Sequence, residues 1–216
     1  MQKNVLLAKT IGRTEFDHPL LWGVLKQLGY AAPTKKIHDL KKAGVIVGIK
    51  KGLYVFPEDY AQEAVSKETL ANLIYGPSYL SLEYALSYHG FIPERVETLT
   101  SVTPKRDKLF HTPVGTFSYR HLAISKYREG VELLWLSPKR SVFMASPEKA
   151  LIDYIVLNKV SVPKSVDSAK IFLEEDLRID SESWKRFNVS LINRLNRVYK
   201  CKAVDVVAQV FERIKP

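Results

Sequence analysis

The sequence predicts an α+β protein in two parts, a winged helix-turn-helix domain over residues 1–60 and a mixed α/β domain over residues 66–216. Two helix-spaced apolar runs precede a β-rich hairpin pattern. A polar stretch, PEDYAQEAVSKE, then interrupts that pattern. Several strand-like and helical runs follow it. We expect the second domain to contain an antiparallel sheet and a helical C-terminal part.

The first domain has clear helix boundaries. Asp17, with a proline two residues on, marks a helix start, and leucines recur at helical spacing until Gly29. Pro33 suits an early position in the next helix, and Gly44 suits its C-terminal cap. Two β-rich runs joined at Lys51-Gly52 predict a hairpin. Helix, short turn, helix and hairpin in this order are typical of a winged helix-turn-helix.

The second domain alternates strand and helix patterns. SKETLANLIY and SLEYALSYHG are helical in pattern, and SPEKALIDYIVLN is a clear helix with Ser146 as its N-cap. Further helical segments are expected near 166–176, 181–187, 190–199 and 203–214. The predicted strands are ETLTSV, KLFHTP, GTFSYRHL, VELLWLS and RSVFMA.

The charge is concentrated at the two ends of the sequence. The chain has a formal net charge of +10 and a pI of about 9.5. Residues 1–60 carry ten basic and five acidic side chains, and residues 181–216 carry eight and three. The segment between them has fifteen of each. Basic surfaces bind polyanions by releasing counterions, so the sequence permits a nucleic-acid partner at either end.

The bulk features favour a cytoplasmic protein with no membrane partner. No apolar run approaches the roughly 18 residues of a membrane span, and the N-terminal apolar patch lacks the long core of a secretory signal. The single cysteine, Cys201, excludes a disulfide framework and a cysteine-based zinc site.

The segment PTKKIHDLKKAG carries the candidate DNA-reading helix. On a helical wheel Ile37 and Leu40 define its buried side. The N-terminal part of such a helix meets base edges, while lysines hold phosphates. The predicted DNA-binding residues are Thr34, Lys35 and His38 for bases, Lys36 and Lys42 for phosphates, and Lys50 and Lys51 at the hairpin tip for the backbone or minor groove.

Asp39 fits this face worst, because its carboxylate would repel phosphate. It could pair with Lys35 or Lys42, or accept from a cytosine amino group. Taken alone, the lysine run is most simply a solvated basic face. The helix and hairpin context favours nucleic-acid binding instead.

Two other features leave alternatives open. The C-terminal cations Arg194, Arg197, Lys200 and Lys202 form either a solvated face or a second contact to a nucleic acid or partner. Four tyrosines between 75 and 88 either pack between helix and sheet, the more common arrangement, or stack on single-stranded bases.

The sequence contains no defensible catalytic or metal-binding constellation. Ser146-Pro-Glu-Lys149 matches the S-x-x-K pattern of serine acyl-enzymes, but its residues equally suit a helix start. The five histidines lack metal-ligand spacing, and no glycine-rich phosphate loop occurs. We therefore expect neither an enzyme nor a bound metal or cofactor.

The segment from Gly76-Pro77-Ser78-Tyr79 to the Pro147-Glu148-Lys149-Ala150 helix start resembles the AbiEi antitoxins of type IV abortive-infection toxin–antitoxin systems. Between them lie the matching Pro113-x-Gly115-Thr116-Phe117 turn and the Gly90-to-Pro93 step. The resemblance is carried by residues 33–155 and is weak over residues 160–216.

The resemblance implies a phage-defence antitoxin and transcriptional repressor. Such proteins bind inverted repeats in their own promoter, as double-stranded DNA, through an N-terminal winged helix. Their C-terminal domain counteracts a co-encoded nucleotidyltransferase-like toxin, with or without a stable complex. The alternative is an interaction module that contacts a protein or RNA directly, with the tyrosines and the Arg194/Arg197 face as its contact surface and the winged helix as scaffold.

Overall fold

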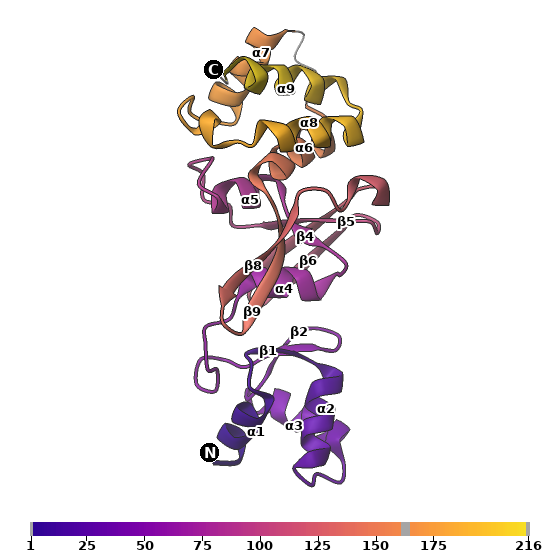
Figure 1. The fold of residues 1–216 in the computed structure, drawn as a ribbon. Helices are drawn as coiled ribbons and strands as arrows, with labels where there is room; N and C mark the ends of the chain where they lie inside the picture. Colours follow the sequence, from indigo (N-terminus) through magenta and orange to yellow (C-terminus); the bar gives the residue numbers. More distant parts are fainter. Residues whose placement is uncertain (1, 161–164, 215–216) are drawn as a thin grey trace.

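The computed structural model describes residues 2–160 and 165–214. These residues form an α+β structure with two sheets, as predicted. Figure 1 shows an elongated molecule in which the N-terminal helices and the C-terminal helices lie at opposite ends, with the larger sheet between them.

The N-terminal part contains three helices and a small antiparallel sheet of order β1-β3-β2. The side chain of Asp17 caps the second helix by accepting from the Leu20 N–H at 3.0 Å, which confirms the predicted start. Gly29 has a φ of +82°, a conformation that strongly favours glycine just past a helix. The elements are α1 (Gln2–Ile11), β1 (Glu15–Asp17), α2 (His18–Gln27), α3 (Pro33–Lys42), β2 (Val47–Lys50) and β3 (Leu53–Val55).

The β2–β3 hairpin belongs to two hydrophobic cores. One face of it, including Tyr54, packs with α1, α2 and α3. On the other face Ile49, Leu53 and Val55 pack into the core of the larger part. Residues 2–60 therefore meet the rest of the chain through buried apolar side chains as well as through a linker.

The larger part has a six-stranded sheet of order β6-β7-β5-β4-β9-β8. The prediction of an antiparallel sheet is wrong in part, because β4 runs parallel to β9 and β5 runs parallel to β7. The predicted strands are all present, while the two-residue β4 is too short for a sequence pattern. Helices and strands before the C-terminal part are α4 (Lys67–Ile74), β4 (Tyr79–Leu80), α5 (Leu82–Tyr88), β5 (Leu99–Thr103), β6 (Lys108–Thr112), β7 (Gly115–His121), β8 (Val131–Ser137), β9 (Arg140–Ala145) and α6 (Pro147–Leu157).

The C-terminal part is helical, as predicted. It packs on α6, whose N-cap Ser146 accepts from the Lys149 N–H at 3.3 Å. Its elements are α7 (Val166–Ile171), a π-helical turn (Phe172–Asp176), a 3-10 turn (Ser183–Arg186), α8 (Val189–Tyr199) and α9 (Lys202–Ile214).

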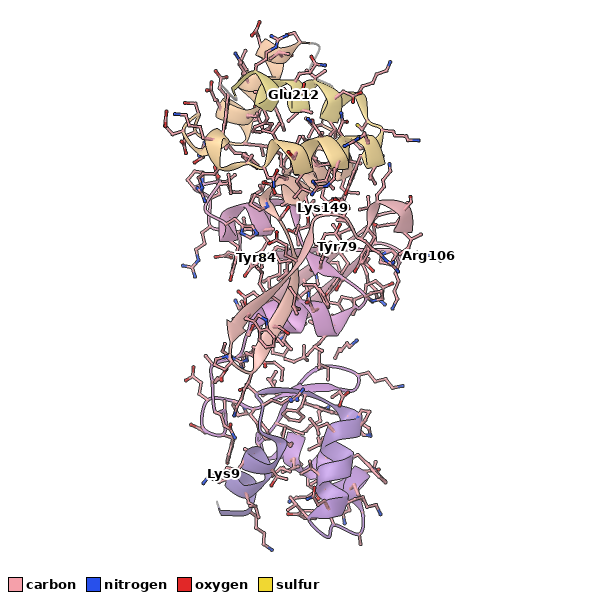
Figure 2. All side chains as sticks on the ribbon, viewed as in Figure 1. Lys9, Tyr79, Tyr84, Arg106, Lys149 and Glu212 are labelled. Carbon is pink, nitrogen blue, oxygen red and sulfur yellow. The ribbon has the colours of Figure 1, made fainter. Side chains whose placement is uncertain are left out.

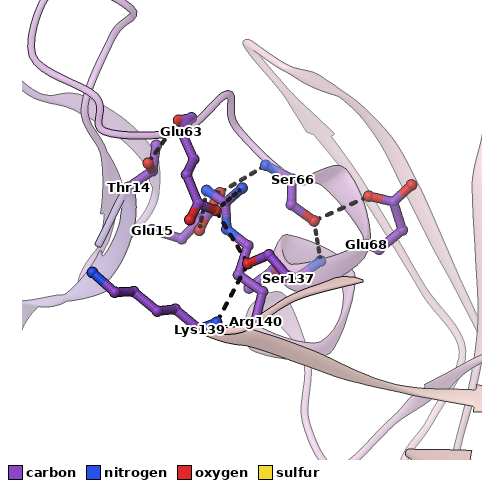
Figure 3. A network of polar contacts seen from close by, with 9 residues as sticks. Thr14, Glu15, Glu63, Ser66, Glu68, Ser137, Lys139 and Arg140 are labelled. Carbon is purple, nitrogen blue, oxygen red and sulfur yellow. Dashed lines mark hydrogen bonds and ion pairs between the residues drawn. The ribbon is translucent and has the colours of Figure 1, made fainter. Parts of the chain in front are cut away.

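A polar network joins the first part to the β8–β9 hairpin (Figure 3). Arg140 bridges two carboxylates, contacting Glu15 Oε1 and Glu63 Oε2 at 3.0 Å each. Glu15 also accepts from the Ser66 N–H at 2.7 Å. The side chain of Glu15 is almost fully buried, so its carboxylate has lost its hydration. These contacts compensate for that loss.

Candidate nucleic-acid interface

Helix α3 presents a cationic face to solvent. Ile37 and Leu40 are buried against the small core, which fixes the rotation of the helix. The side chains predicted to face DNA therefore point outward. Thr34, Lys35, His38 and Lys42 are all exposed, and Lys36 is half-buried.

The N-terminus of α3 favours an anion in a second way. Its N-cap residue is Ala32, which provides no side-chain hydrogen bond to the first turn. Pro33 has no N–H, so the backbone N–H groups of Thr34 and Lys35 remain for an external acceptor. Lys36 is already engaged in part, because its ammonium lies 5.1 Å from the centre of the Tyr30 ring.

Asp39 is exposed in the middle of this face. No ion pair among the residues of 2–160 and 165–214 involves it, so the structure shows neither of its predicted pairings, with Lys35 or with Lys42. Its carboxylate stays available to a ligand, either as a repulsive charge or as an acceptor for a base amino group.

One of the two hairpin lysines, Lys50, makes a contact that the prediction did not include. Lys50 is the last residue of β2, and its ammonium donates to the carbonyl oxygen of Ile74 at the end of α4. Burial, then the neighbouring Lys105 and Lys108, lower the pKa of Lys50. Lys50 is thus not a free lysine at a projecting hairpin tip, because the hairpin is packed on the larger part. Lys50 and Lys51, which lies in the turn itself, are both exposed, so Lys50 differs in its contact with Ile74 and not in its exposure.

The contacts of Lys50 reveal a cationic cluster that sequence reasoning missed. Lys105 donates to the carbonyl oxygen of Gly76, and its ammonium lies 5.1 Å from the centre of the Tyr75 ring. Lys108 lies 5.5 Å from the same ring. Arg106, in the same loop, points outward at the edge of the molecule (Figure 2). Nothing in the local sequence pairs this loop with the hairpin, because their approach depends on how the two parts pack.

The C-terminal cations lie far from α3, at the opposite end of the molecule (Figure 1). Arg194, Arg197, Lys200 and Lys202 are all exposed. Arg194 is neutralised in part by Glu129, with 2.9 Å between its Nε and Oε1 of the carboxylate. The structure therefore does not bring the two basic ends together into one site.

Three of the four clustered tyrosines are engaged in packing. Tyr79 is fully buried, and Tyr84 donates to Glu68 at 2.5 Å. Tyr75 makes an edge contact with Tyr119 at 5.3 Å between centroids. Tyr88 is exposed, and it lines a surface cleft of about 720 Å³ between α4, α5 and β7. Of the four rings only Tyr88 is largely exposed, and Tyr84 lines the same cleft beside it.

The S-x-x-K sequence is part of a buried ion-pair network. Lys149 and Asp153 have side chains of 0% exposure, and their Nζ and Oδ1 atoms are 3.0 Å apart. Tyr79 and Ser81 donate to the other carboxylate oxygen at 2.9 and 2.7 Å. Tyr199 donates to the carboxylate and accepts from Lys149. Figure 2 shows Tyr79 and Lys149 in the interior, between the sheet and the C-terminal helices.

This network has the environment of a structural cluster. Burial lowers the pKa of Lys149, while Asp153 opposes that effect. The Ser146 hydroxyl is used as the helix cap, and Lys149 points to Asp153. None of the residues lining the four main clefts of the described chain is Lys149 or Asp153, so no ligand path to the pair is evident.

Two further findings concern metals and membranes. In the described part of the chain, no group of three or more histidine, cysteine or acidic residues is arranged to hold a metal ion. Among the same residues, no helix combines the length and apolar character that crossing a bilayer requires.

Comparison with known proteins does not assign the chain to a family. No protein-family model matches the chain, and a search of curated proteins finds no match.

Proposed function

We propose that this protein is a DNA-binding antitoxin that represses its own operon and counteracts a co-encoded nucleotidyltransferase-like toxin, acting in the cytoplasm. The observation that carries the DNA-binding half is α3, with four outward-facing predicted contacts and an uncapped N-terminus. The antitoxin half depends on the sequence resemblance alone.

The order of helices and strands in residues 2–55 supports a winged helix-turn-helix in which α3 is the reading helix. Thr34, Lys35 and His38 would contact base edges, and Lys36 and Lys42 would contact phosphates. The hairpin would serve mainly as the joint to the larger part, because one of its faces is buried there. Lys51 would be its remaining phosphate contact.

The test is binding to the protein's own upstream DNA, measured by electrophoretic mobility shift over a range of salt concentrations. We expect clear preference over random duplex. The double change Lys35→Ala, Lys42→Ala should weaken binding, and loss of the Lys42 phosphate contact should reduce the salt slope by about 0.9. The matched control is Arg197→Ala, Lys202→Ala at the opposite end of the molecule, which should leave the slope unchanged.

Equal binding to promoter and random duplex at moderate salt would contradict the repressor proposal. An unchanged slope in the α3 variant would show that its lysines are only solvated surface. The antitoxin half is tested separately, by co-expressing the protein with the product of the adjacent gene and measuring growth. A toxic product that this protein fails to neutralise would exclude that half.

A further inference from the structure

Apolar side chains are exposed together on one face of the β8–β9 hairpin. Leu133, Trp135 and Phe143 are 47%, 68% and 51% exposed. Leu73, on the adjacent helix α4, is 46% exposed. We call the surface formed by these four residues the hairpin face. Contiguous apolar surface of this kind commonly marks an interaction site.

The strand register explains why the face is apolar. Leu133 lies directly opposite Phe143 in the β8–β9 pairing. The alternate residues Val142 and Met144 are buried on the other side of the sheet. In VELLWLS, apolar residues therefore fall on both faces of the strand, Leu133 and Trp135 on one and Leu134 on the other, where Glu132 is also exposed. The described residues bury one of these faces and leave most of the other exposed.

A groove of about 630 Å³ continues the hairpin face toward α4 and includes Tyr127 and Val131. Two of its polar groups are already occupied. Asn72 accepts from the Phe143 N–H at 2.6 Å and donates to the Phe143 carbonyl oxygen, and Ser78 donates to the Ala71 carbonyl oxygen. A ligand in the groove would thus meet mainly apolar surface.

The groove also contains one free charge. Arg128 lines it and is exposed, and no ion pair of the described residues includes this guanidinium. A planar guanidinium binds a carboxylate in a bidentate manner. The preferred ligand is therefore apolar and carries a nearby acid.

We propose that the hairpin face binds an acidic protein partner, through an extended apolar segment that pairs with β8. β8 is an edge strand, so one side of its backbone can accept another strand. Arg128 favours an acidic segment, and a second copy of the same groove would bring no carboxylate to it, because the residues that line the groove include no acid. A nucleic acid fits poorly, because four apolar side chains accompany one cation. This inference is independent of the proposed DNA binding.

The experiment uses a displayed random dodecapeptide library selected on the full-length protein. We expect enriched peptides to alternate apolar and polar residues and to contain Asp or Glu. Trp135→Glu should weaken their binding at least about tenfold, since buried tryptophans dominate such contacts. The matched control is Leu109→Glu on β6 at the other edge of the same sheet, where Leu109 is 54% exposed. This control should bind as the wild type does.

Arg128→Ala should weaken a peptide that carries the acid, but not its amide analogue. Absence of enrichment, or equal binding by Trp135→Glu, would overturn the proposal. A concentration-dependent wild-type dimer that Trp135→Glu abolishes would instead assign the face to a second copy.

Circular dichroism checks folding, and Leu133→Ser replaces Trp135→Glu if the latter does not fold. Promoter binding of Trp135→Glu is measured in parallel, so failure of either proposal is seen separately.

Discussion

Helices α3 and α6 both carry lysines, in opposite surroundings. On α3, Lys35 and Lys42 are exposed and form no ion pair with any described residue. On α6, Lys149 is completely buried and is matched by Asp153 one helical turn later. The structure shows no ion-pair partner for Lys35 or Lys42 among the described residues, whereas Lys149 has its counter-charge within the fold. The comparison separates exposed lysines, which we propose as DNA contacts, from a buried structural pair that contains the same residue type.

The largest expected effect comes from breaking the α6 pair. Asp153→Ala would leave Lys149 buried without its counter-charge, and Tyr79 and Ser81 would lose their acceptor. We expect the free energy of unfolding to fall by about 3–5 kcal/mol, measured by urea denaturation. The double change Lys149→Met, Asp153→Leu serves as the control and should lose much less, because no unpaired charge remains. Equal losses would show that the ion pair is not what the fold requires.

Alkaline pH should also destabilise the region after residue 66. Six tyrosines have a raised pKa, and burial is the largest cause in each case. The pKa of Tyr127 is raised to about 12. The six are Tyr79, Tyr84, Tyr119, Tyr127, Tyr154 and Tyr199. Unfolded tyrosines lose their protons near pH 10, before the folded ones. Stability is therefore retained below about pH 10 and falls as pH rises above it. The fall is up to about 1.4 kcal/mol per pH unit for each fully buried tyrosine, and less for the partly exposed Tyr84, Tyr127 and Tyr154.

This pH dependence is measured as the urea midpoint between about pH 9 and about pH 11.5. Tyr127→Phe should make the fall of stability with pH shallower, by at most the contribution of one titrating proton. Tyr88→Phe, on the surface, is the control and should leave the fall unchanged. A midpoint that stays constant over the range would contradict the expected role of the buried hydroxyls.

A smaller effect is expected at the joint between the two parts. Arg140→Ala would leave the buried Glu15 carboxylate with the Ser66 N–H as its remaining partner in the network. We expect a loss of about 2 kcal/mol in the free energy of unfolding and faster proteolysis between residues 57 and 66. Lys139→Ala, at the exposed neighbouring position, should change neither. Unchanged proteolysis in Arg140→Ala would indicate that apolar packing alone holds the joint.

The smallest effect is expected at Asp39. If its carboxylate only repels phosphate, Asp39→Asn should strengthen binding to every duplex by about 1 kcal/mol or less, measured by titration at fixed salt. The opposite result, weaker promoter binding with lost preference at one G·C pair, would mean that Asp39 accepts from a cytosine. Either outcome decides how α3 differs from a uniformly positive surface.

Local signals in the sequence were sufficient for most of the fold. Caps such as Asp17 and Ser146, and glycines such as Gly29, fixed helix ends because they act within one turn of the chain. Apolar spacing fixed which side of α3 is buried, and hence which of its candidate residues face solvent. The strands β5 to β9 were predicted from their own residue patterns, which are also local. The strands β1 and β4 are too short to show such a pattern.

What the sequence could not determine depends on contacts between distant segments. Lys50 was expected at a free tip, yet it reaches Ile74, because the hairpin packs on the larger part. The parallel strand pairs and the exposed hairpin face likewise arise from sheet order. By itself, the sequence determined most of the helices and strands and the buried side of α3, since local backbone preferences and periodic burial produce them. Only the tertiary structure decided which charges are matched and which apolar faces stay open, because those depend on partners far along the chain.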